Sequence, residues 1–393
     1  MNWLEEAKEW NEQADWRHRL HRCAEVGFEL TKTLETVEQA LEGMGVRPER
    51  CGKAGLTATI GSGKPCFLLR ADMDALPITE QTDLPYVSET GNMHACGHDM
   101  HTAMLLGAAR LLKRHEGEWN GSVRLMFQPA EETLSGAKDM IENGVLEGVL
   151  AGMMLHVMAG VPLPCGTVVV PQGGIGAPSA DFFTVTVQGK SCHGSSPQNG
   201  IDALAAAAKI VTALNGLVAA ECPAGSGAVL SIGSFHAGEA ANVIADRAEL
   251  KGSLRAFSDE QRDYIKTRLS AISSLTASAG RATASVTFDS GCPALVNDPK
   301  MVALALQTAT DLLGKSRTVS AADFGGNSIR GGSEDFAYVS RKIPTVMVAL
   351  SAAEKGNPHP LHHPELVFDD AVLPIGSALL ASTATEWLKK ASL

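Results

Sequence analysis

The sequence has no long uninterrupted apolar run and no excess of basic side chains. The longest apolar stretch, residues 203–220, is alanine-rich and is interrupted by Lys209 and Asn215, whereas a membrane-spanning helix needs roughly 20 consecutive apolar residues. Lysine and arginine number 33 against 44 acidic residues, which gives a formal net charge of -11. Because phosphates and anionic lipid surfaces are bound by clustered basic side chains, we expect no nucleic-acid partner and no membrane partner.

Paired cysteines and an apolar leader are also missing. The first residues, MNWLEEAKEWNEQADW, are charged and lack the apolar core of a signal peptide. The cysteines are scattered without paired spacing, which favours reduced thiols over a disulfide framework. They are Cys23, Cys51, Cys66, Cys96, Cys165, Cys192, Cys222 and Cys292. We therefore expect a cytoplasmic protein.

The overall amino-acid composition is typical of a folded globular protein. Apolar residues make up 45% and charged residues 20% of 393 residues, which argues against disorder. This length exceeds what one hydrophobic core usually supports, so two domains are expected.

Short apolar runs alternate with helical patterns in residues 1–177 and 292–393. This alternation predicts one discontinuous domain of α/β/α architecture around a mixed sheet. The expected strands are 66–71, 123–127, 151–157 and 344–350, and the clearest helices are 102–114 and about 371–390.

Residues 178–291 show a different order of elements. Strand, helix, strand, strand, helix and strand are expected at 182–188, 202–218, 228–235, 243–256, 258–278 and 284–288. This order is typical of a ferredoxin-like α+β fold. Because α/β elements resume after it, the segment is predicted to be an inserted domain.

Side chains that bind metals or move protons follow the expected strands of the first domain. They are Asp72, Asp74, Cys96, His98, Glu131, Glu132, His156, His362 and His363. Since ligands of open α/β sheets bind outside the carboxyl ends of the strands, these groups are predicted to face one edge. Imidazole, carboxylate and thiolate suit Zn, Mn, Co or Ni. Of two adjacent glutamates, one can bind metal while the other serves as a base.

Several other interpretations compete with a metal site. Asp72 and Asp74 could be turn residues, and a strand-end histidine is usually only hydrogen-bonded. The P-loop-like segment 61–64 lacks the earlier glycine, and Pro65 follows its lysine. Cys96 could be a nucleophile with a histidine as its base. That alternative stays open, although it leaves the glutamate pair without a role.

Six motifs together resemble the N-acyl-amino-acid amidohydrolases. This family includes hippurate hydrolases and auxin-conjugate hydrolases, within the aminoacylase and carboxypeptidase group of dinuclear metallohydrolases. The motifs are LRADMDALP (69–77), MHACGHDMHTAMLLGAA (93–109), FQPAEE (127–132), LHV (155–157), GSEDFA (332–337) and HHP (362–364).

The resemblance implies roles for individual residues. Two divalent ions would be bound by Cys96, His98, Glu132, His156 and His362. Glu131 would be the general base and Asp72 a supporting acid behind the ligands. His362 is preferred over His363 because the family ligand is the first residue of its His-x-Pro motif. The implied reaction is hydrolysis of the amide bond of an N-acyl amino acid, giving a carboxylic acid and a free amino acid.

The resemblance also makes the inserted segment a lid that dimerises. His193 would reach an active site, often that of the partner subunit, and stabilise the oxyanion. Asn242 and Arg255 match positions that contact substrate, and Arg255 is the candidate for the substrate carboxylate because a guanidinium forks onto it. An ordinary salt bridge on a strand is the alternative for Arg255. Gln198 follows Pro197 where many relatives have histidine, so substrate specificity is the least determined feature.

Other activities remain compatible with the same residues. A dipeptidase, a carboxypeptidase or a deaminase-like C–N hydrolase could use this site. A metal-binding protein without catalysis is less well supported, because pure metal binding requires no spare base at Glu131.

Overall fold

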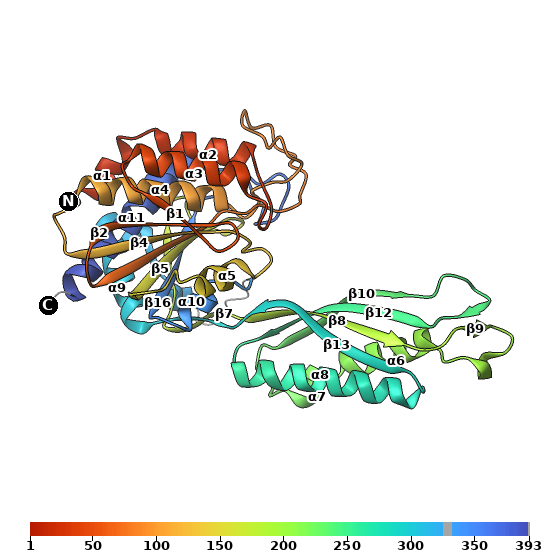
Figure 1. Cartoon of the computed structure of the whole chain (residues 1–393). Coiled ribbons are helices and arrows are strands. Elements are labelled where there is room, and N and C mark those ends of the chain that lie inside the picture. Colours follow the sequence, from red (N-terminus) through yellow and green to blue (C-terminus); the bar gives the residue numbers. More distant parts are fainter. Residues whose placement is uncertain (325–331, 392–393) are drawn as a thin grey trace. The chain divides into compact units, whose positions relative to one another are not determined.

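The computed structural model describes residues 1–324 and 332–391, which form two compact units (Figure 1). The first unit comprises Met1–Gly176 with the described residues 296–324 and 335–391. The second unit comprises Ala177–Leu295 with residues 332–334. The expected insertion, 178–291, falls within the second unit.

A mixed eight-stranded sheet forms the centre of the first unit, in the order β1-β2-β4-β3-β5-β16-β6-β15. All four expected strands are present as β3, β4, β5 and β16, with ends within two residues of the predicted ones. The strands are β1 Pro48–Cys51, β2 Gly55–Ser62, β3 Cys66–Asp72, β4 Gly121–Gln128, β5 Val149–Met158, β6 Val168–Val170, β15 Thr318–Ser320 and β16 Thr345–Ser351.

The four central strands run parallel, so their carboxyl ends share one edge. Asp72 at the end of β3 pairs with Gln128 at the end of β4. His156 near the end of β5 pairs with Ala349 on β16. This register confirms that the candidate residues follow strands that end at the same edge. The antiparallel strands β1 and β2, which lie beyond β4, were not expected.

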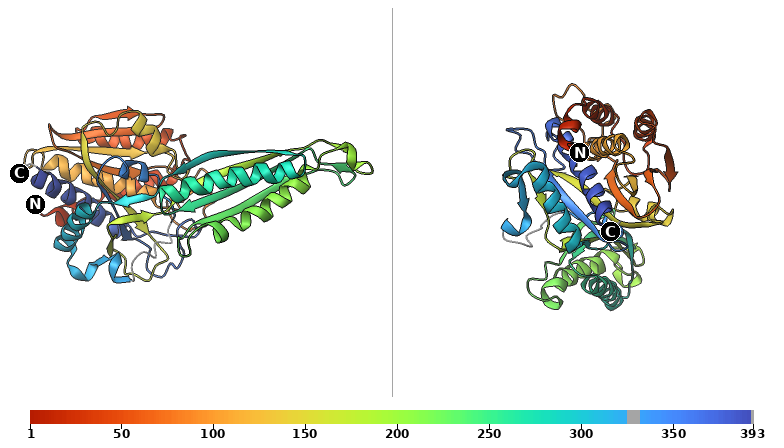
Figure 2. Two further views of the ribbon diagram at one scale, coloured as in Figure 1. Left: turned by 90° about the horizontal axis from the view of Figure 1, so that it is seen from below. Right: turned by 90° about the vertical axis from the view of Figure 1, so that its left-hand side faces the viewer.

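Helices cover this sheet, and every residue of β3 is buried. The long helices α4 and α11 pack against each other and both contact β3 (Figure 2), while α5 and α10 contact each other and, respectively, β4 and β16. The helices of this unit are α1 Trp3–Lys8, α2 Glu12–Arg22, α3 Thr31–Gly43, α4 His98–Arg114, α5 Gly136–Glu142, α9 Pro299–Leu313, α10 Ala337–Ser340 and α11 Leu373–Ala391.

Among the described residues, one helical segment, Asp370–Ala391, is long and apolar enough by composition to cross a membrane. However, 78% of its apolar window is buried inside the protein. Its contacts with α4, β3 and β5 account for this burial. The segment therefore has the environment of a core helix.

The second unit contains a four-stranded antiparallel sheet of order β10-β12-β8-β13. Its chain order and strand order confirm the ferredoxin-like arrangement. Inward residues of β8 such as Phe183, Val185 and Val187 are buried in one core with residues of α6 and α8. The elements are β8 Ser179–Gln188, α6 Ala203–Asn215, α7 Leu217–Glu221, β10 Val229–Ala237, β12 Arg247–Ala256, α8 Asp259–Ala279 and β13 Thr283–Cys292.

Two small sheets complete the description. Strand β9 (Cys192–His193) pairs with β11 (Val243–Ile244) in the second unit. Strand β7 (Gly174–Ala177) pairs with β14 (Leu295–Asn297) where the chain enters and leaves that unit.

Candidate metal centre

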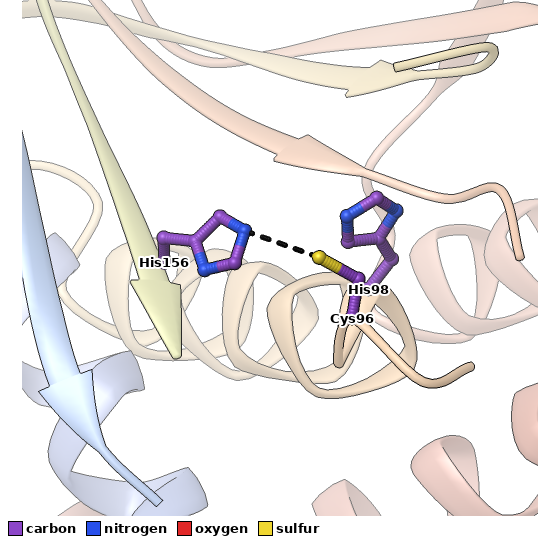
Figure 3. A group of neighbouring side chains, drawn as sticks. All are labelled: Cys96, His98 and His156. Carbon is purple, nitrogen blue, oxygen red and sulfur yellow. Dashed lines mark hydrogen bonds between the residues drawn. The ribbon is translucent and has the colours of Figure 1, made fainter. Parts of the chain in front are cut away.

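Helix α4 begins at His98, four residues earlier than expected, directly after the loop that carries Cys96. Gly97 makes this loop possible, because its φ is +82° and a Cβ there would lie 2.3 Å from Cγ2 of Val157. A glycine lets the loop approach β5 closely. As a result the side chains of Cys96, His98 and His156 lie close together (Figure 3).

His156 directs an unprotonated nitrogen toward Cys96. Its Nδ1 lies 2.6 Å from the carbonyl oxygen of Val157, which can only accept, so Nδ1 is the donor. The other nitrogen, Nε2, lies 3.6 Å from Sγ of Cys96. Burial, and then the neighbouring His101, lower the pKa of His156 to about 3. The ring is therefore neutral, with its free lone pair on Nε2.

His98, the first residue of α4, also donates from Nδ1 to a backbone carbonyl oxygen. Its Nδ1 donates to the carbonyl oxygen of Asp74 at 2.8 Å. Its Nε2 lies 3.7 Å from Asp72 and 3.9 Å from each of Glu131 and Glu132. Burial lowers the pKa of His98, but the Asp72 carboxylate outweighs it and raises that pKa well above the ordinary value. The carboxylates thus create a strong preference for positive charge beside Nε2.

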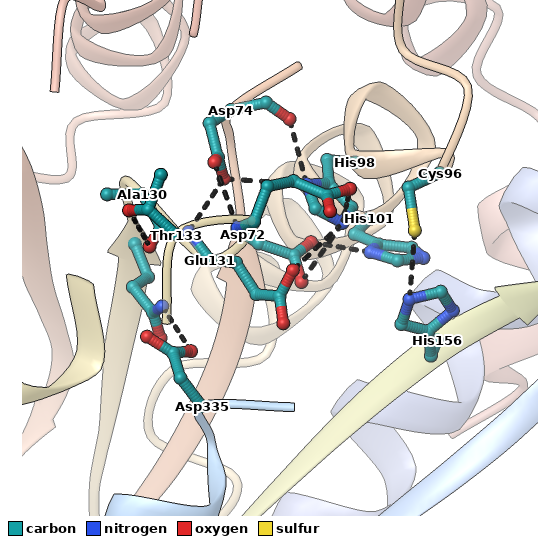
Figure 4. Close-up of polar contacts among 12 residues, drawn as sticks. Asp72, Asp74, Cys96, His98, His101, Ala130, Glu131, Thr133, His156 and Asp335 are labelled. Carbon is teal, nitrogen blue, oxygen red and sulfur yellow. Dashed lines mark hydrogen bonds and ion pairs between the residues drawn. The ribbon is translucent and has the colours of Figure 1, made fainter. Parts of the chain in front are cut away.

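Asp74 holds the glutamate pair in place. Its two carboxylate oxygens accept the backbone N–H groups of Glu131 at 3.0 Å and Glu132 at 3.2 Å (Figure 4). The preceding residue, Ala130, has a φ of 53°, so the chain turns sharply just before the pair. Asp74 is therefore more than a turn residue, because it orients two candidate functional carboxylates toward one site.

His362 reaches this site from the loop after β16. Its Nε2 lies 3.6 Å from Oε1 of Glu132, and its side chain is 51% exposed. Its backbone N–H donates to the carbonyl oxygen of Ala95 at 2.9 Å, which ties the loop to the segment before Cys96. His362 groups with Cys96 and Glu132, whereas His363 groups with His359 and Glu365. The geometry thus places the two adjacent histidines in different groups.

The donor atoms fit divalent metal ions. Within each of the triads Cys96, His98, His156 and Cys96, Glu132, His362, the possible ligand atoms lie within 4.8 Å of one another. Nε2 of His98 and Oε1 of Glu132 are buried and have no hydrogen-bond partner among the residues that the structure describes. Burial raises the pKa of Glu132 to about 7 and also raises that of the Cys96 thiol. A nearby cation would favour the anionic form of both groups, and a bound metal ion would supply that charge.

Comparison with known proteins agrees with this chemistry. The family described as peptidase family M20/M25/M40 matches residues 68–386, most of the chain. The chain belongs to this family. This membership confirms the resemblance to the amidohydrolases, and the protein is a hydrolase.

Curated M20 relatives span nearly the whole chain. An N-acetyl-L-cysteine deacetylase of Bacillus subtilis is 36% identical over 377 residues, covering 95% of this chain and 87% of its own length. An IAA-amino acid hydrolase, ILR1-like 4 of Arabidopsis thaliana, is 36% identical over 392 residues, with 96% and 87% covered.

Solved structures give the same result. A Bacillus subtilis protein described as a dinuclear metal binding peptidase of the M20 family superposes with a TM-score of 0.78 at 33% identity, covering 96% of this chain and 98% of its own. A structure from methicillin resistant Staphylococcus aureus reaches a TM-score of 0.88, also at 33% identity, with 98% and 99% covered. Together with the residue groups above, these neighbours support two divalent metal ions in this M20 protein.

A buried network behind the M20 centre holds Asp72. Arg70 donates to Asp72 at 2.5 Å, to Gln128 at 2.8 Å and to Asp335 at 3.1 Å. Burial raises the pKa of Asp72, but Arg70, His98 and His101 outweigh it and hold that pKa well below the ordinary value. Asp72 is therefore a permanent anion beside His98. Arg70, Gln128 and Asp335 were not predicted to contribute.

His101 was also missed as a member of the site. Its Nε2 accepts the backbone N–H of Val157 at 2.8 Å, and its Nδ1 donates to Asp72 at 2.5 Å. It follows His98 by three residues, so both project from the same face of α4. This three-residue spacing is the feature of the sequence that could have identified His101 as a site residue.

The predicted residues of the second unit fall into two places. His193 on β9 and Asn242 just before β11 are neighbours, since the N–H of Gly194 donates to the carbonyl oxygen of Asn242 at 2.7 Å. Arg255 lies near the other end of β12 and donates to Oγ of Ser333 at 2.8 Å. The structure thus brings two of the three together.

Proposed function

We propose that this M20 protein hydrolyses the amide bond of N-acyl amino acids and releases a carboxylic acid and a free amino acid. The observation that carries the proposal is a buried carboxylate, Glu131, held beside a set of metal-ligand side chains. Two curated relatives, a deacetylase and a hydrolase of conjugated amino acids by name, cleave amides of this kind.

We assign Cys96, His98, Glu132, His156 and His362 as the residues that hold two divalent ions. Zn, Mn, Co and Ni all suit this mixture of sulfur, nitrogen and oxygen donors. When bound, such ions polarise a carbonyl and lower the pKa of water toward neutrality. The supporting geometry is the two triads of donor atoms that share Cys96.

In this proposal Glu131 moves the proton. Its carboxylate takes a proton from the attacking water and delivers it to the nitrogen of the leaving amine as the C–N bond breaks. Asp74 keeps Glu131 aimed at the site by accepting its backbone N–H. Asp72 holds His98 and His101 through its permanent negative charge.

We further propose that the second unit is a lid and a dimerisation domain. His193 would stabilise the oxyanion, while Asn242 and Arg255 would bind substrate, the latter through its carboxylate. Arg247 to Arg255 on β12 spans roughly 26 Å at about 3.3 Å per residue, and β9 lies beyond the Arg247 end (Figure 1). Because this separation far exceeds one N-acyl amino acid, we infer that His193 and Arg255 of one chain serve different active sites in a homodimer.

The free state of all eight cysteines supports a reducing compartment. We therefore propose that the protein is cytoplasmic.

Glu131→Gln tests the central assignment. We expect turnover of N-acyl amino acids to fall by at least about 100-fold, because general base catalysis contributes that much or more. Metal content should be unchanged by elemental analysis, since Glu131 is not assigned as a ligand. Glu142→Gln on α5, whose side chain is 64% exposed, is the matched control and should behave as wild type. Loss of metal in Glu131→Gln would instead place Glu131 among the ligands.

A substrate panel on chelator-stripped protein separates the competing reactions. N-acyl amino acids and dipeptides are assayed with Zn, Mn, Co or Ni added back. We expect metal-dependent release of amino acid from the acylated substrates. Activity that survives thorough chelation would support Cys96 as a nucleophile, whereas preference for dipeptides would make the protein a dipeptidase.

A further inference from the structure

The ring of His193 is held by the residue two positions later. The backbone N–H of Ser195 donates to Nδ1 of His193 at 3.1 Å, and Oγ of Ser195 lies 2.8 Å from the same nitrogen. A backbone N–H can only donate, so Nδ1 must be an acceptor. The neutral ring therefore carries its proton on Nε2, and the hydroxyl of Ser195 donates as well.

The backbone of His193 is fixed on both sides. His193 pairs with Val243 across β9 and β11, and the N–H of Ser196 donates to the carbonyl oxygen of His193 at 2.9 Å. The next residue must be small, because a Cβ on Gly194 would lie 2.9 Å from the carbonyl oxygen of Asn242. Both the position and the ring orientation of His193 are thus set before any substrate binds.

We propose that Ser195 is a positioning residue that selects the Nε2–H tautomer of His193. The inference rests on the proposed function, in which His193 meets the oxygen of the acyl carbonyl. In this tautomer the ring offers that oxygen an uncharged N–H donor in a fixed direction. A preorganised donor stabilises negative charge as it develops, so it acts on the transition state more than on substrate binding. No proton needs to leave His193, because Glu131 carries the transferred proton.

Ser195→Ala removes the hydroxyl and leaves the backbone N–H. We expect kcat to fall about 3- to 10-fold, the equivalent of one ordinary hydrogen bond, with KM within about twofold of wild type. Ser195→Thr keeps the hydroxyl and should restore most of the activity. Ser196→Ala is the matched control, because the hydroxyl of Ser196 makes no hydrogen bond among the residues that the structure describes.

The same substitution in a His193→Ala background shows whether Ser195 acts through His193. Once the ring is gone, Ser195→Ala should cause no further loss of kcat. An equal loss in both backgrounds, or failure of threonine to restore activity, would overturn the proposal.

The tautomer can be measured without any substrate. Full-length, metal-loaded protein is labelled with 15N-histidine, and the His193 signals are assigned by their loss in His193→Ala. We expect a protonated Nε2 and an unprotonated Nδ1 in wild type, with a tautomer mixture in Ser195→Ala. A mixture already present in wild type would refute the role of Ser195. Failure of wild type to cleave any substrate would refute the proposed function and leave this result interpretable.

Discussion

At the scale of single residues, His101 joins two parts of the metal centre through its two ring nitrogens. Nε2 accepts from the N–H of Val157, beside His156, and Nδ1 donates to Asp72, which faces His98. The ring is almost fully buried. Removal of the ring would leave a buried N–H and a buried carboxylate oxygen without this partner.

We predict that His101→Ala lowers metal affinity about 10- to 100-fold, as is usual when a group that orients metal ligands is lost. The metal-free protein should also lose about 2–4 kcal/mol of unfolding free energy, because two buried polar groups lose a partner. Competition with a chromophoric chelator measures the first quantity and urea denaturation measures the second.

His236→Ala, at an exposed position on β10, is the control for His101→Ala and should change neither quantity. Unaltered metal affinity in His101→Ala would mean that Asp72 and Val157 keep their positions without the ring.

The sequence was sufficient to choose the candidate ligands, because thiol, imidazole and carboxylate groups are rare together at strand ends. It was not sufficient for Asp74 or Arg70. The role of Asp74 consists of two hydrogen bonds to backbone N–H groups 57 and 58 residues away. Such bonds leave no pattern in the residue types.

At the scale of elements, a buried ionic cluster joins α2 to the start of α4. Arg17 donates to Asp99 at 3.1 Å, and Nδ1 of His21 lies 2.8 Å from the same carboxylate oxygen. Nε2 of His21 lies 3.2 Å from Glu80. Burial lowers the pKa of His21, but Asp99 and Glu80 outweigh it and raise the pKa to about 9. Since Asp99 follows His98, this cluster anchors the end of α4 that carries a metal ligand.

We predict that the protein loses stability as the pH rises into the alkaline range, because His21 then loses its proton. A raised folded-state pKa stabilises fully below the unfolded value of about 6.5, and the contribution is lost as pH rises toward about 9. The melting temperature of the metal-free wild-type protein should therefore fall across this pH window. The corresponding loss in the free energy of unfolding is on the order of 1–3 kcal/mol.

His21→Gln should be less stable than wild type at pH 6 and should show a flatter profile between pH 6.5 and 9. Thermal scans at matched ionic strength provide the measurement. Parallel profiles for the two proteins would show that His21 is not charged in the folded state.

Elements with a strong internal pattern were predictable, and edge elements were not. The apolar run of β3 and the largely apolar sequence of α4 could be recognised because nearly all residues of both elements are buried. Strand β1 has four residues, of which only Cys51 is buried, and it is defined by its pairing with β2. Helix α4 starts earlier than expected because Gly97 allows the tight approach to Val157.

At the scale of the whole molecule, the proposed homodimer predicts complementation between inactive chains. Glu131→Gln should lack the base and His193→Ala should lack the oxyanion donor. If each His193 completes the partner's site, a mixed dimer contains one site with both groups intact.

Random mixing of the two variants should therefore recover roughly a quarter of the wild-type activity, because half of the dimers are mixed and each holds one complete site. The variants are coexpressed with different tags and the mixed dimer is purified. With one complete site of two, its hydrolysis rate should be about half that of the wild-type dimer and well above that of either parent. A mixed dimer as inactive as its parents would indicate that His193 serves its own chain.

The sequence by itself determined the family, the α/β and ferredoxin-like classes and the candidate ligands, because these depend on residue type, local periodicity and order along the chain. Tertiary structure alone decided which nitrogen of each histidine is free, how Asp74 and Asp72 are used, and that His193 lies beside Asn242 and away from Arg255. These features depend on distances between groups far apart in sequence. They are set by the register of paired strands and by the direction of single hydrogen bonds, neither of which a linear pattern encodes.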